Sequence, residues 1–165
     1  MQFVCTPQGS TRALRKRTRD LMPDVTILLV EDNPDDAALT ELALRGDIPA
    51  RLQIARDGQE ALDYLFNHTN NLPRLVLLDL RLPNMDGLEV LRRIRENERT
   101  CLTPVVILTS STAPDDVALG YRHGANSYVG KPLDFDQFSR LLRQLGAYWL
   151  DVNEPPPTVS QSSQR

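Results

Sequence analysis

Short apolar runs alternate along the chain with segments of helical periodicity, and this alternation restricts the possible fold more than any other feature. Val25–Val30, Leu75–Asp79 and Val105–Thr109 have the length and composition of buried strands. Arg51–Ala55 alternates as a strand near a sheet edge does, and Asn126–Val129 is a short fifth strand. A helical segment follows each strand. These five strand–helix units predict an α/β fold in which helices cover both faces of a parallel sheet.

The helical segments have recognisable start signals. Asn33-Pro34 places a proline at the first helical position with acids in the first turn, and Asp57-Gly58 turns the chain into the second helix. Gly46 is placed to end the first helix, in which helical spacing relates Ala38, Leu39, Leu42 and Ala43. One side of the last helix is lined by Phe135, Phe138, Leu141, Leu142, Leu145 and Trp149.

A single domain over residues 25–150 is expected for a chain of 165 residues, with a tail on either side. Residues 1–24 are poor in large apolar side chains and predict a disordered tail. The alternatives are a basic arm that touches membrane or nucleic acid, and a true start at Met22. Residues 151–165 are rich in Pro, Ser and Gln and predict a second, flexible tail. The basic residues of the first tail are Arg12, Arg15, Lys16, Arg17 and Arg19.

Charge and hydropathy exclude several classes of function. The net charge of -3 gives no electrostatic reason to bind nucleic acid, and the longest apolar runs are too short to span a membrane. Cys5 and Cys101 fit neither a disulfide framework nor the spacing of a metal site. We therefore expect a cytoplasmic protein without a DNA-binding domain and without membrane contact.

Ionisable and hydroxyl side chains stand at the carboxyl ends of the predicted strands, where parallel sheets bind their ligands. Glu31-Asp32 follows the first strand, Asp79 ends the third, Thr109 ends the fourth, and Lys131 follows the fifth. One carboxylate in such a place could be a helix cap. Three together repel strongly in a partly dry site and need a cation to coexist. Oxygen ligands with an incomplete protein shell suit Mg²⁺.

This set of groups suits phosphoryl transfer to a carboxylate. A carboxylate that attacks phosphorus forms an acyl phosphate, and the obstacle is repulsion between the anionic nucleophile and the anionic donor. Mg²⁺, Lys131 and the Thr109 hydroxyl would neutralise and orient the transferring group. A Mg²⁺-dependent phosphohydrolase could use similar parts, but no further motif supplies its general base or substrate pocket.

These motifs, in this order, resemble the bacterial response-regulator receiver family of two-component signalling. The resemblance runs from about Val25 to Leu150. It implies a flavodoxin-like, doubly wound sheet of five parallel strands in the order 2-1-3-4-5 with five helices. It also implies a protein that is no enzyme beyond catalysing its own phosphorylation and dephosphorylation. The matching motifs are Val30-Glu31-Asp32-Asn33, Asp79, Leu82-Pro83-Asn84-Met85-Asp86-Gly87, Thr109, Tyr128 and Lys131-Pro132.

The resemblance implies a role for each matching residue. Asp79 is the implied phosphoryl acceptor, with Lys131 and Thr109 as its catalytic partners. Thr109 and Tyr128 form the implied switch, and Pro132 is expected to follow a cis peptide bond. The implied Mg²⁺ ligands are Asp32, Asp79, the backbone carbonyl of Arg81 and, through water, Glu31.

A narrower resemblance concerns the partner. Residues 55–65, 124–132 and 148–150 are similar to regulators that work with phytochrome-type kinases. The implied phosphoryl donor is therefore a sensor histidine kinase, and a light-sensing one of the phytochrome type. Passing the phosphoryl group on, as an intermediate in a relay, is an alternative use of the same site.

The signal is expected to leave through the face of the fourth helix, fifth strand and fifth helix. Phosphorylation would draw Thr109 toward the new oxygens, and Tyr128 would then turn inward. Only fifteen residues follow position 150, so the output is expected to be protein contact or onward phosphotransfer. We predict a symmetric homodimer; the alternative is a monomer in which Trp149 folds back on the domain. The predicted interface residues are Phe138, Leu142, Tyr148 and Trp149.

Two positions depart from the commonest members of the family. Arg81 lies two residues after the acceptor and Ser111 two after Thr109, and these positions in the family influence the access of water. We predict that Arg81 contacts or shields the phosphoryl group and prolongs the phosphorylated state. A receiver that serves only as a binding module is a third reading, and the intact acidic residues, Thr109 and Lys131 argue against it.

Overall fold

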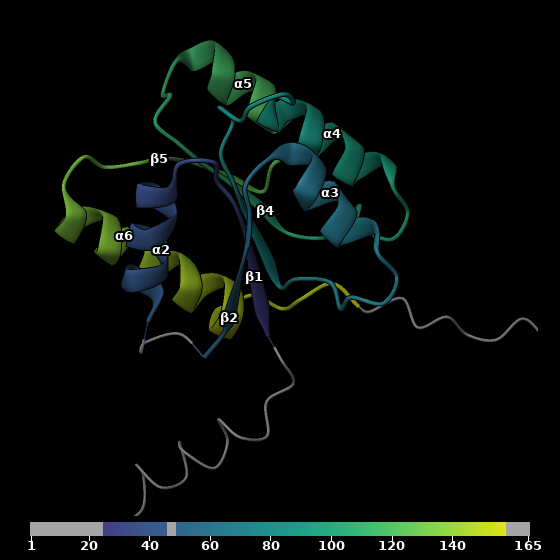
Figure 1. Ribbon diagram of the computed structural model, residues 1–165, viewed down its shortest axis with the longest axis horizontal. Coiled ribbons are helices and arrows are strands. Elements are labelled where there is room, and N and C mark those ends of the chain that lie inside the picture. The colour runs from purple at the N-terminus through teal and green to yellow at the C-terminus, as the bar shows by residue number, and fades with distance from the viewer. Residues whose placement is uncertain (1–24, 46–48, 158–165) are drawn as a thin grey trace, which may run out of the picture.

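The computed structural model describes residues 25–45 and 49–157 (Figure 1). The predicted tail over 1–24 and the helix end at Gly46 lie outside these residues. Within them, strands and helices alternate and a π-helical turn, η1, follows the last α-helix. The elements are β1 (Thr26–Val30), α2 (Pro34–Leu44), β2 (Arg51–Ala55), α3 (Gly58–Phe66), β3 (Leu75–Leu78), α4 (Gly87–Glu96), β4 (Val105–Thr109), α5 (Pro114–Arg122), β5 (Ser127–Gly130), α6 (Phe135–Gly146) and η1 (Ala147–Val152).

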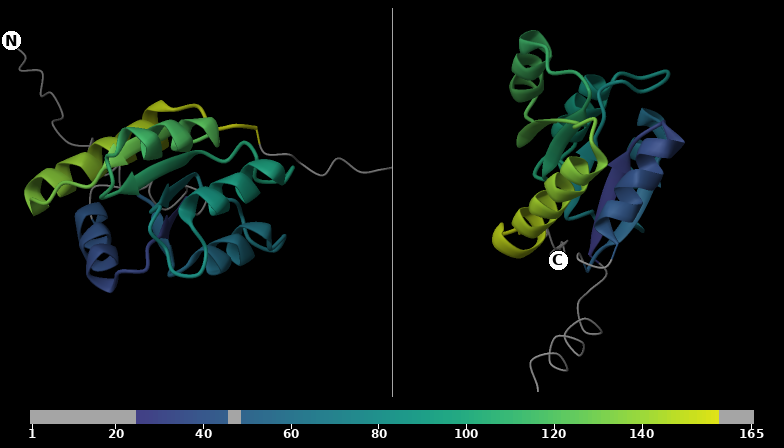
Figure 2. Two further views of the ribbon diagram at one scale, coloured as in Figure 1. Left: turned by 90° about the horizontal axis from the view of Figure 1, so that it is seen from above. Right: turned by 90° about the vertical axis from the view of Figure 1, so that its left-hand side faces the viewer.

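The five strands form one parallel sheet in the order β2-β1-β3-β4-β5, which confirms the predicted fold and strand order. Helices α2 and α6 lie on one face, while α3, α4 and α5 lie on the other (Figures 1 and 2). The central strands β1, β3 and β4 are apolar except for Thr26 and Thr109, because both of their faces are covered. Along β1, Leu28 and Val30 pack on the α3–α4 side, and Ile27 and Leu29 pack on the α2–α6 side.

Side-chain caps start four of the helices that follow the strands. Asn33 accepts hydrogen bonds from the backbone N–H groups of Asp35 and Asp36, at 2.9 and 3.3 Å. Asp57, Asp86 and Asp134 cap α3, α4 and α6 in the same way. Because these caps satisfy N–H groups that have no partner in the helix, each helix begins at a fixed residue beside the sheet edge.

The buried face of α2 differs from the spacing noted in the sequence. Leu39 and Leu42 are exposed, whereas Ala37, Thr40, Ala43 and Leu44 are buried. Thr40 tolerates burial because its hydroxyl donates a 2.8 Å hydrogen bond to the Asp36 carbonyl. The helix is therefore turned so that small side chains, and not the two leucines, face the domain.

The predicted interface on the last helix is wrong for three of its four residues. The core between the sheet, α2 and α6 contains Phe138, Leu142 and Trp149 as buried residues. The apolar surface of α6 therefore packs against the domain itself and is not free to contact a second chain. Tyr148 is 50% exposed and packs edge-on against Trp149, with ring centroids 5.1 Å apart. Trp149 thus folds back on the domain, as the alternative reading required.

Helical structure continues to Val152, two residues beyond the predicted end of the domain at 150. The Arg74 guanidinium donates to the carbonyls of Leu150 and Asn153, both at 3.5 Å, and so ties the end of the helix to the start of β3. Nowhere in the described part of the chain is a helix long and apolar enough to cross a membrane.

Arg95 joins α4 to the loops that lead into β4 and β5. Its guanidinium donates to the carbonyls of Gly124 (2.9 Å), Cys101 (3.1 Å) and Thr103 (2.8 Å), and to the Asn126 side-chain oxygen (2.9 Å). Burial lowers the pKa of Arg95 below its ordinary value. One side chain thereby satisfies the acceptors of two loops that flank neighbouring strands.

Candidate functional site

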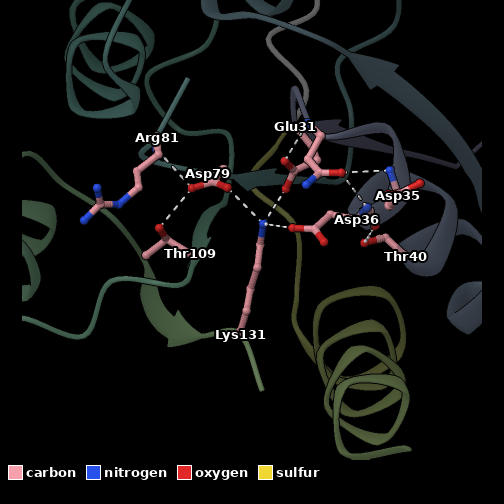
Figure 3. Close-up of polar contacts among 9 residues, drawn as sticks. Glu31, Asp35, Asp36, Thr40, Asp79, Arg81, Thr109 and Lys131 are labelled. Carbon is pink, nitrogen blue, oxygen red and sulfur yellow. Dashed lines mark hydrogen bonds and ion pairs between the residues drawn. The ribbon is translucent and has the colours of Figure 1, made fainter. Parts of the chain in front are cut away.

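The predicted site residues meet at the carboxyl edge of the sheet (Figure 3). Glu31 directly follows β1, Asp79 directly follows β3, Thr109 ends β4 and Lys131 directly follows β5. Their convergence is a consequence of the parallel order, which brings the ends of β1, β3, β4 and β5 to one edge.

Asp79 is held from three directions. Its Oδ1 atom accepts hydrogen bonds from the Thr109 hydroxyl at 2.9 Å and from the Arg81 backbone N–H at 3.0 Å. Its Oδ2 atom accepts a bond from the Lys131 ammonium at 2.9 Å. Asp79 is only 7% exposed, so the carboxylate has a fixed orientation with little competition from water.

Gly87, which follows the Asp86 cap, allows the start of α4 to lie close to the backbone at Asp79 and Leu80. A Cβ atom on Gly87 would lie 2.3 Å from the Asp79 carbonyl oxygen and 2.7 Å from the Leu80 Cα, both backbone atoms that cannot yield. The Gly87 N–H also donates to the Leu80 carbonyl at 2.9 Å. The motif glycine therefore lets α4 begin against the backbone of the proposed acceptor.

Lys131 connects three carboxylates. Its ammonium donates to Glu31 Oε2, to Asp79 Oδ2 at 2.9 Å and to Asp36 Oδ2 at 3.1 Å (Figure 3). Burial alone would lower the pKa of Lys131, but the bonds to Glu31 and Asp79, and their charge, raise it above its ordinary value. The ammonium therefore stays charged at any physiological pH.

Glu31 is almost fully buried, and its two oxygens have different partners. Oε1 accepts the Asn33 backbone N–H at 3.0 Å, and Oε2 accepts from Lys131. Burial raises the pKa of Glu31, although the Lys131 ammonium and the Asn33 N–H act against this. Asp32 is exposed, and its carboxylate makes no hydrogen bond to another of the described residues.

The donor chemistry of Glu31, Asp32 and Asp79 fits a hard divalent cation, because all three offer carboxylate oxygens. Their arrangement is less complete than the sequence predicted. Among the residues that the structure describes, no three metal-binding side chains are grouped closely enough to hold an ion. Between Glu31 and Asp79 lies the Lys131 ammonium, which bonds both. The predicted metal ligands thus remain a prediction.

Tyr128 and Ser111 form a second cluster beside Thr109. The half-buried Tyr128 donates its hydroxyl to the Ser111 carbonyl at 2.9 Å, and the Ser111 hydroxyl donates to Asp116 on α5. A Cβ on Gly120 would lie 2.8 Å from the Tyr128 ring, so the absence of a side chain there makes room for the ring. Burial, followed by the charge of Asp116, raises the pKa of Tyr128.

Two further expectations concern the neighbours of Asp79 and Lys131. The Arg81 side chain is exposed and extends away from Lys131 in Figure 3, while its backbone N–H contacts Asp79. The expected cis bond before Pro132 is wrong, since the described residues contain no cis peptide bond. A trans bond is the favoured state of an X–Pro pair by about 0.5–1 kcal/mol.

Asp36 is the site residue that the sequence reasoning missed. The acid pair Asp35-Asp36 was explained by the helix start alone, and this explanation holds for both residues. Only Asp36 lies on the same side of α2 as the buried Thr40 and Ala43, which follow it four and seven positions along the helix. The position of Asp36 on the face of α2 that turns toward the domain is the signal that would have identified it.

The fold and site together have the architecture of a receiver domain, in which a buried aspartate lies between a lysine and a threonine at the edge of a five-stranded parallel sheet. The chain belongs to the response regulator receiver domain family, whose model matches residues 27–143.

Its relatives include regulators from different signalling systems. The chain is 47% identical over 134 residues to the probable methanogenesis regulatory protein FilR2 of Methanothrix harundinacea, covering 79% of this chain and 86% of FilR2. It is 36% identical over 135 residues to the response regulator Rcp1 of Synechocystis, covering 79% and 92% of the two chains.

Solved structures agree with the fold. The Mn²⁺-bound form of Rcp1 has a TM-score of 0.75 at 35% identity, covering 82% of this chain and all of that one. The phosphorylated cyanobacterial phytochrome response regulator RcpA has a TM-score of 0.76 at 34% identity with the same coverage. The chain is thus a two-component response regulator domain related to the phytochrome response regulators.

Proposed function

We propose that Asp79 accepts a phosphoryl group from a histidine kinase and that the resulting acyl phosphate is the signal. The observation that carries the proposal is the set of donors on its carboxylate: the Thr109 hydroxyl, the Arg81 N–H and the Lys131 ammonium. The ammonium and hydroxyl are placed to stabilise the charge of a transferring phosphoryl group. Relatives described as phosphorylated and Mn²⁺-bound support the same chemistry.

Mg²⁺ is the proposed cofactor, held by Asp32, Asp79 and the Arg81 carbonyl, with Glu31 bound through water. When bound, it would neutralise negative charge on the phosphoryl oxygens. The chain's own residues orient the acceptor: Thr109 and Arg81 fix Oδ1 and thereby the plane of the carboxylate. Lys131 brings a positive charge to the side of Oδ2.

We expect wild-type protein treated with radiolabelled acetyl phosphate and Mg²⁺ to be labelled, and Asp79→Asn to remain unlabelled. The amide keeps the shape of the carboxylate but cannot form an acyl phosphate. Asp134→Asn, at an exposed helix cap, is the control and should label normally. Chelation of divalent ions should prevent labelling of the wild type and of Asp134→Asn. Equal labelling of Asp79→Asn would refute the assignment.

The donor that we propose is a sensor histidine kinase of the phytochrome type. We propose that the two proteins interact in the cytosol. The likeness to Rcp1 and RcpA supports this choice. The sequence identity to FilR2, which is described as a probable methanogenesis regulatory protein, is higher than the identity to Rcp1. The class of kinase is therefore tested directly. Phosphotransfer from a purified phytochrome kinase, compared with an unrelated histidine kinase, is the appropriate assay.

Arg81 is proposed to prolong the phosphorylated state. Its side chain is exposed and points away from Asp79 in Figure 3, so the guanidinium would have to turn toward a phosphorylated Asp79 to contact its oxygens and hinder water. We expect Arg81→Ala to shorten the lifetime of labelled protein severalfold, measured as loss of label after the donor is removed. An unchanged lifetime would show that Arg81 contributes only its backbone.

The proposed homodimer uses the face of α5, β5 and α6, which corresponds to the predicted one. Tyr148, which was predicted, stays a candidate for the contact because it is exposed, and exposed Tyr121 on α5 is added in place of the three buried residues. We expect light scattering to report a dimer that Tyr148→Glu weakens. The control is Trp149→Glu, which should instead destabilise the fold because Trp149 is buried. A monomeric wild type would contradict the proposal.

A further inference from the structure

Asp36 is the most exposed of the three carboxylates bonded to Lys131. The Lys131 Nζ atom lies 3.1 Å from Asp36 Oδ2 and 2.9 Å from Asp79 Oδ2, and it also bonds Glu31. The side chain of Asp36 is 38% exposed, against 3% for Glu31 and 9% for Asp79. Asp36 comes from α2, on the opposite side of the ammonium from Asp79 in Figure 3.

The Lys131 ammonium has no hydrogen to spare. An ammonium group carries three N–H donors, and the three carboxylates use all of them. A phosphoryl oxygen that arrives at Asp79 can accept a bond from Lys131 only if one of these carboxylates gives up its own.

Solvent exposure decides which carboxylate dissociates most readily. Releasing Glu31 would leave a buried charge without its partner, which is strongly unfavourable. Releasing Asp36 lets water solvate a carboxylate that is already partly exposed, so this ion pair costs the least of the three to break. Asp79 itself is the group that carries the phosphoryl oxygens.

We propose that Asp36 is a positioning residue that occupies, on Lys131, the place of a phosphoryl oxygen. While Asp79 is unmodified, Asp36 holds the ammonium between α2 and the acceptor. During transfer from acetyl phosphate, the P–O bond to the acetate leaving group breaks and acetate takes the electron pair. A new P–O bond forms to Asp79, and a phosphoryl oxygen replaces Asp36 on Lys131. This inference rests on the proposed function of Asp79.

Asp36→Asn and Asp35→Asn make a matched pair for the kinetic test. Both remove one negative charge from the same turn of α2, but only Asp36 contacts Lys131. We expect Asp36→Asn to lower the half-saturating concentration of acetyl phosphate about threefold to tenfold, because the donor no longer competes with a carboxylate. The rate at saturation should stay within about twofold. Asp35→Asn and Asp36→Glu should resemble wild type.

The chain permits a direct view of the ammonium, because Lys16 and Lys131 are its only lysines. We expect the side-chain ¹H–¹⁵N NMR signal of Lys131 to differ between wild type and Asp36→Asn. Beryllium fluoride, which mimics a phosphoryl group on a carboxylate, should make the two signals converge, since Asp36 is then displaced in wild type as well. Signals that remain apart would show that Asp36 stays bonded and would overturn the proposal.

The outcomes separate this inference from the function on which it rests. Absence of label on wild-type Asp79 would refute the proposed function whatever Asp36 does. A labelled wild type with Asp36→Asn equal to Asp35→Asn in half-saturation would refute the role of Asp36 alone. A tenfold or greater loss of the saturated rate in Asp36→Asn would also refute it, because Asp36 would then be needed during transfer.

Discussion

Replacement of Lys131 by Gln is expected to slow phosphorylation by acetyl phosphate about 10²- to 10³-fold at saturating donor, the effect of removing one preorganised donor from a charged transition state. The ammonium is the only cation bonded to Asp79 among the described residues. Without it, the phosphoryl group would approach Asp79, Glu31 and Asp36 with one positive charge fewer between them.

The experiment has a control in the only other lysine. Lys16→Gln removes the same charge from the chain and should label at the wild-type rate. Lys131→Gln also leaves the buried Glu31 without its ion-pair partner, so cooperative unfolding followed by the fluorescence of Trp149 must first show that the variant is folded. A folded Lys131→Gln with a rate within about threefold of wild type would contradict the role given to the ammonium.

Arg95→Ala is expected to cost about 3 kcal/mol of the free energy of unfolding. The guanidinium donates to four acceptors in the two loops that lead into β4 and β5, three of them backbone carbonyls. Removing it leaves part-buried acceptors without partners, and each such loss costs about 1–3 kcal/mol where water cannot replace the donor. Denaturant unfolding, followed by Trp149 fluorescence, measures this change.

Arg93→Ala is the matched control, since it lies two residues away on the same helix. Its guanidinium makes an exposed i,i+4 pair with Glu89 at 2.8 Å, which is expected to contribute less than about 1 kcal/mol. Equal losses for the two variants would mean that Arg95 acts only through its surface charge. Phosphorylation at a temperature where both are folded should be unaffected, because neither residue contacts Asp79.

The strands and the site edge were predictable because their signals are local. Strand β3 has apolar side chains on both of its faces, as a covered parallel strand requires; they include Val76, Leu77 and Leu78. Asp79 follows directly. Once the strands are parallel, their carboxyl ends must share an edge. The predicted meeting of Asp79, Thr109 and Lys131 therefore needed no knowledge of tertiary detail.

Apart from the expected cis bond before Pro132, the errors concern which side of a helix faces inward. Leu42 was grouped with the apolar spacing of α2 but is 55% exposed, while the polar Thr40 is buried. Phe138 and Trp149 were assigned to an interface but fill the domain's own core. An apolar face shows that a helix packs against something; it does not show whether the partner belongs to the same chain.

Asp36 illustrates the same limit within the site. An acidic residue in the first turn of α2 is already explained by the start of the helix. Only the rotation of α2 about its axis brings the Asp36 carboxylate to 3.1 Å from the Lys131 ammonium. Arg95 is a similar case, because its acceptors lie up to 31 positions away along the chain. Neither contact has a sequence signature.

The most direct test of the account is the mass of the intact protein during incubation with acetyl phosphate and Mg²⁺. We predict the gain of one phosphoryl group per chain, located on Asp79 by peptide mapping, with no sustained release of phosphate from a general phosphoester. Continuous turnover of a phosphoester without retained mass, or a phosphoryl group on a residue other than Asp79, would contradict the account.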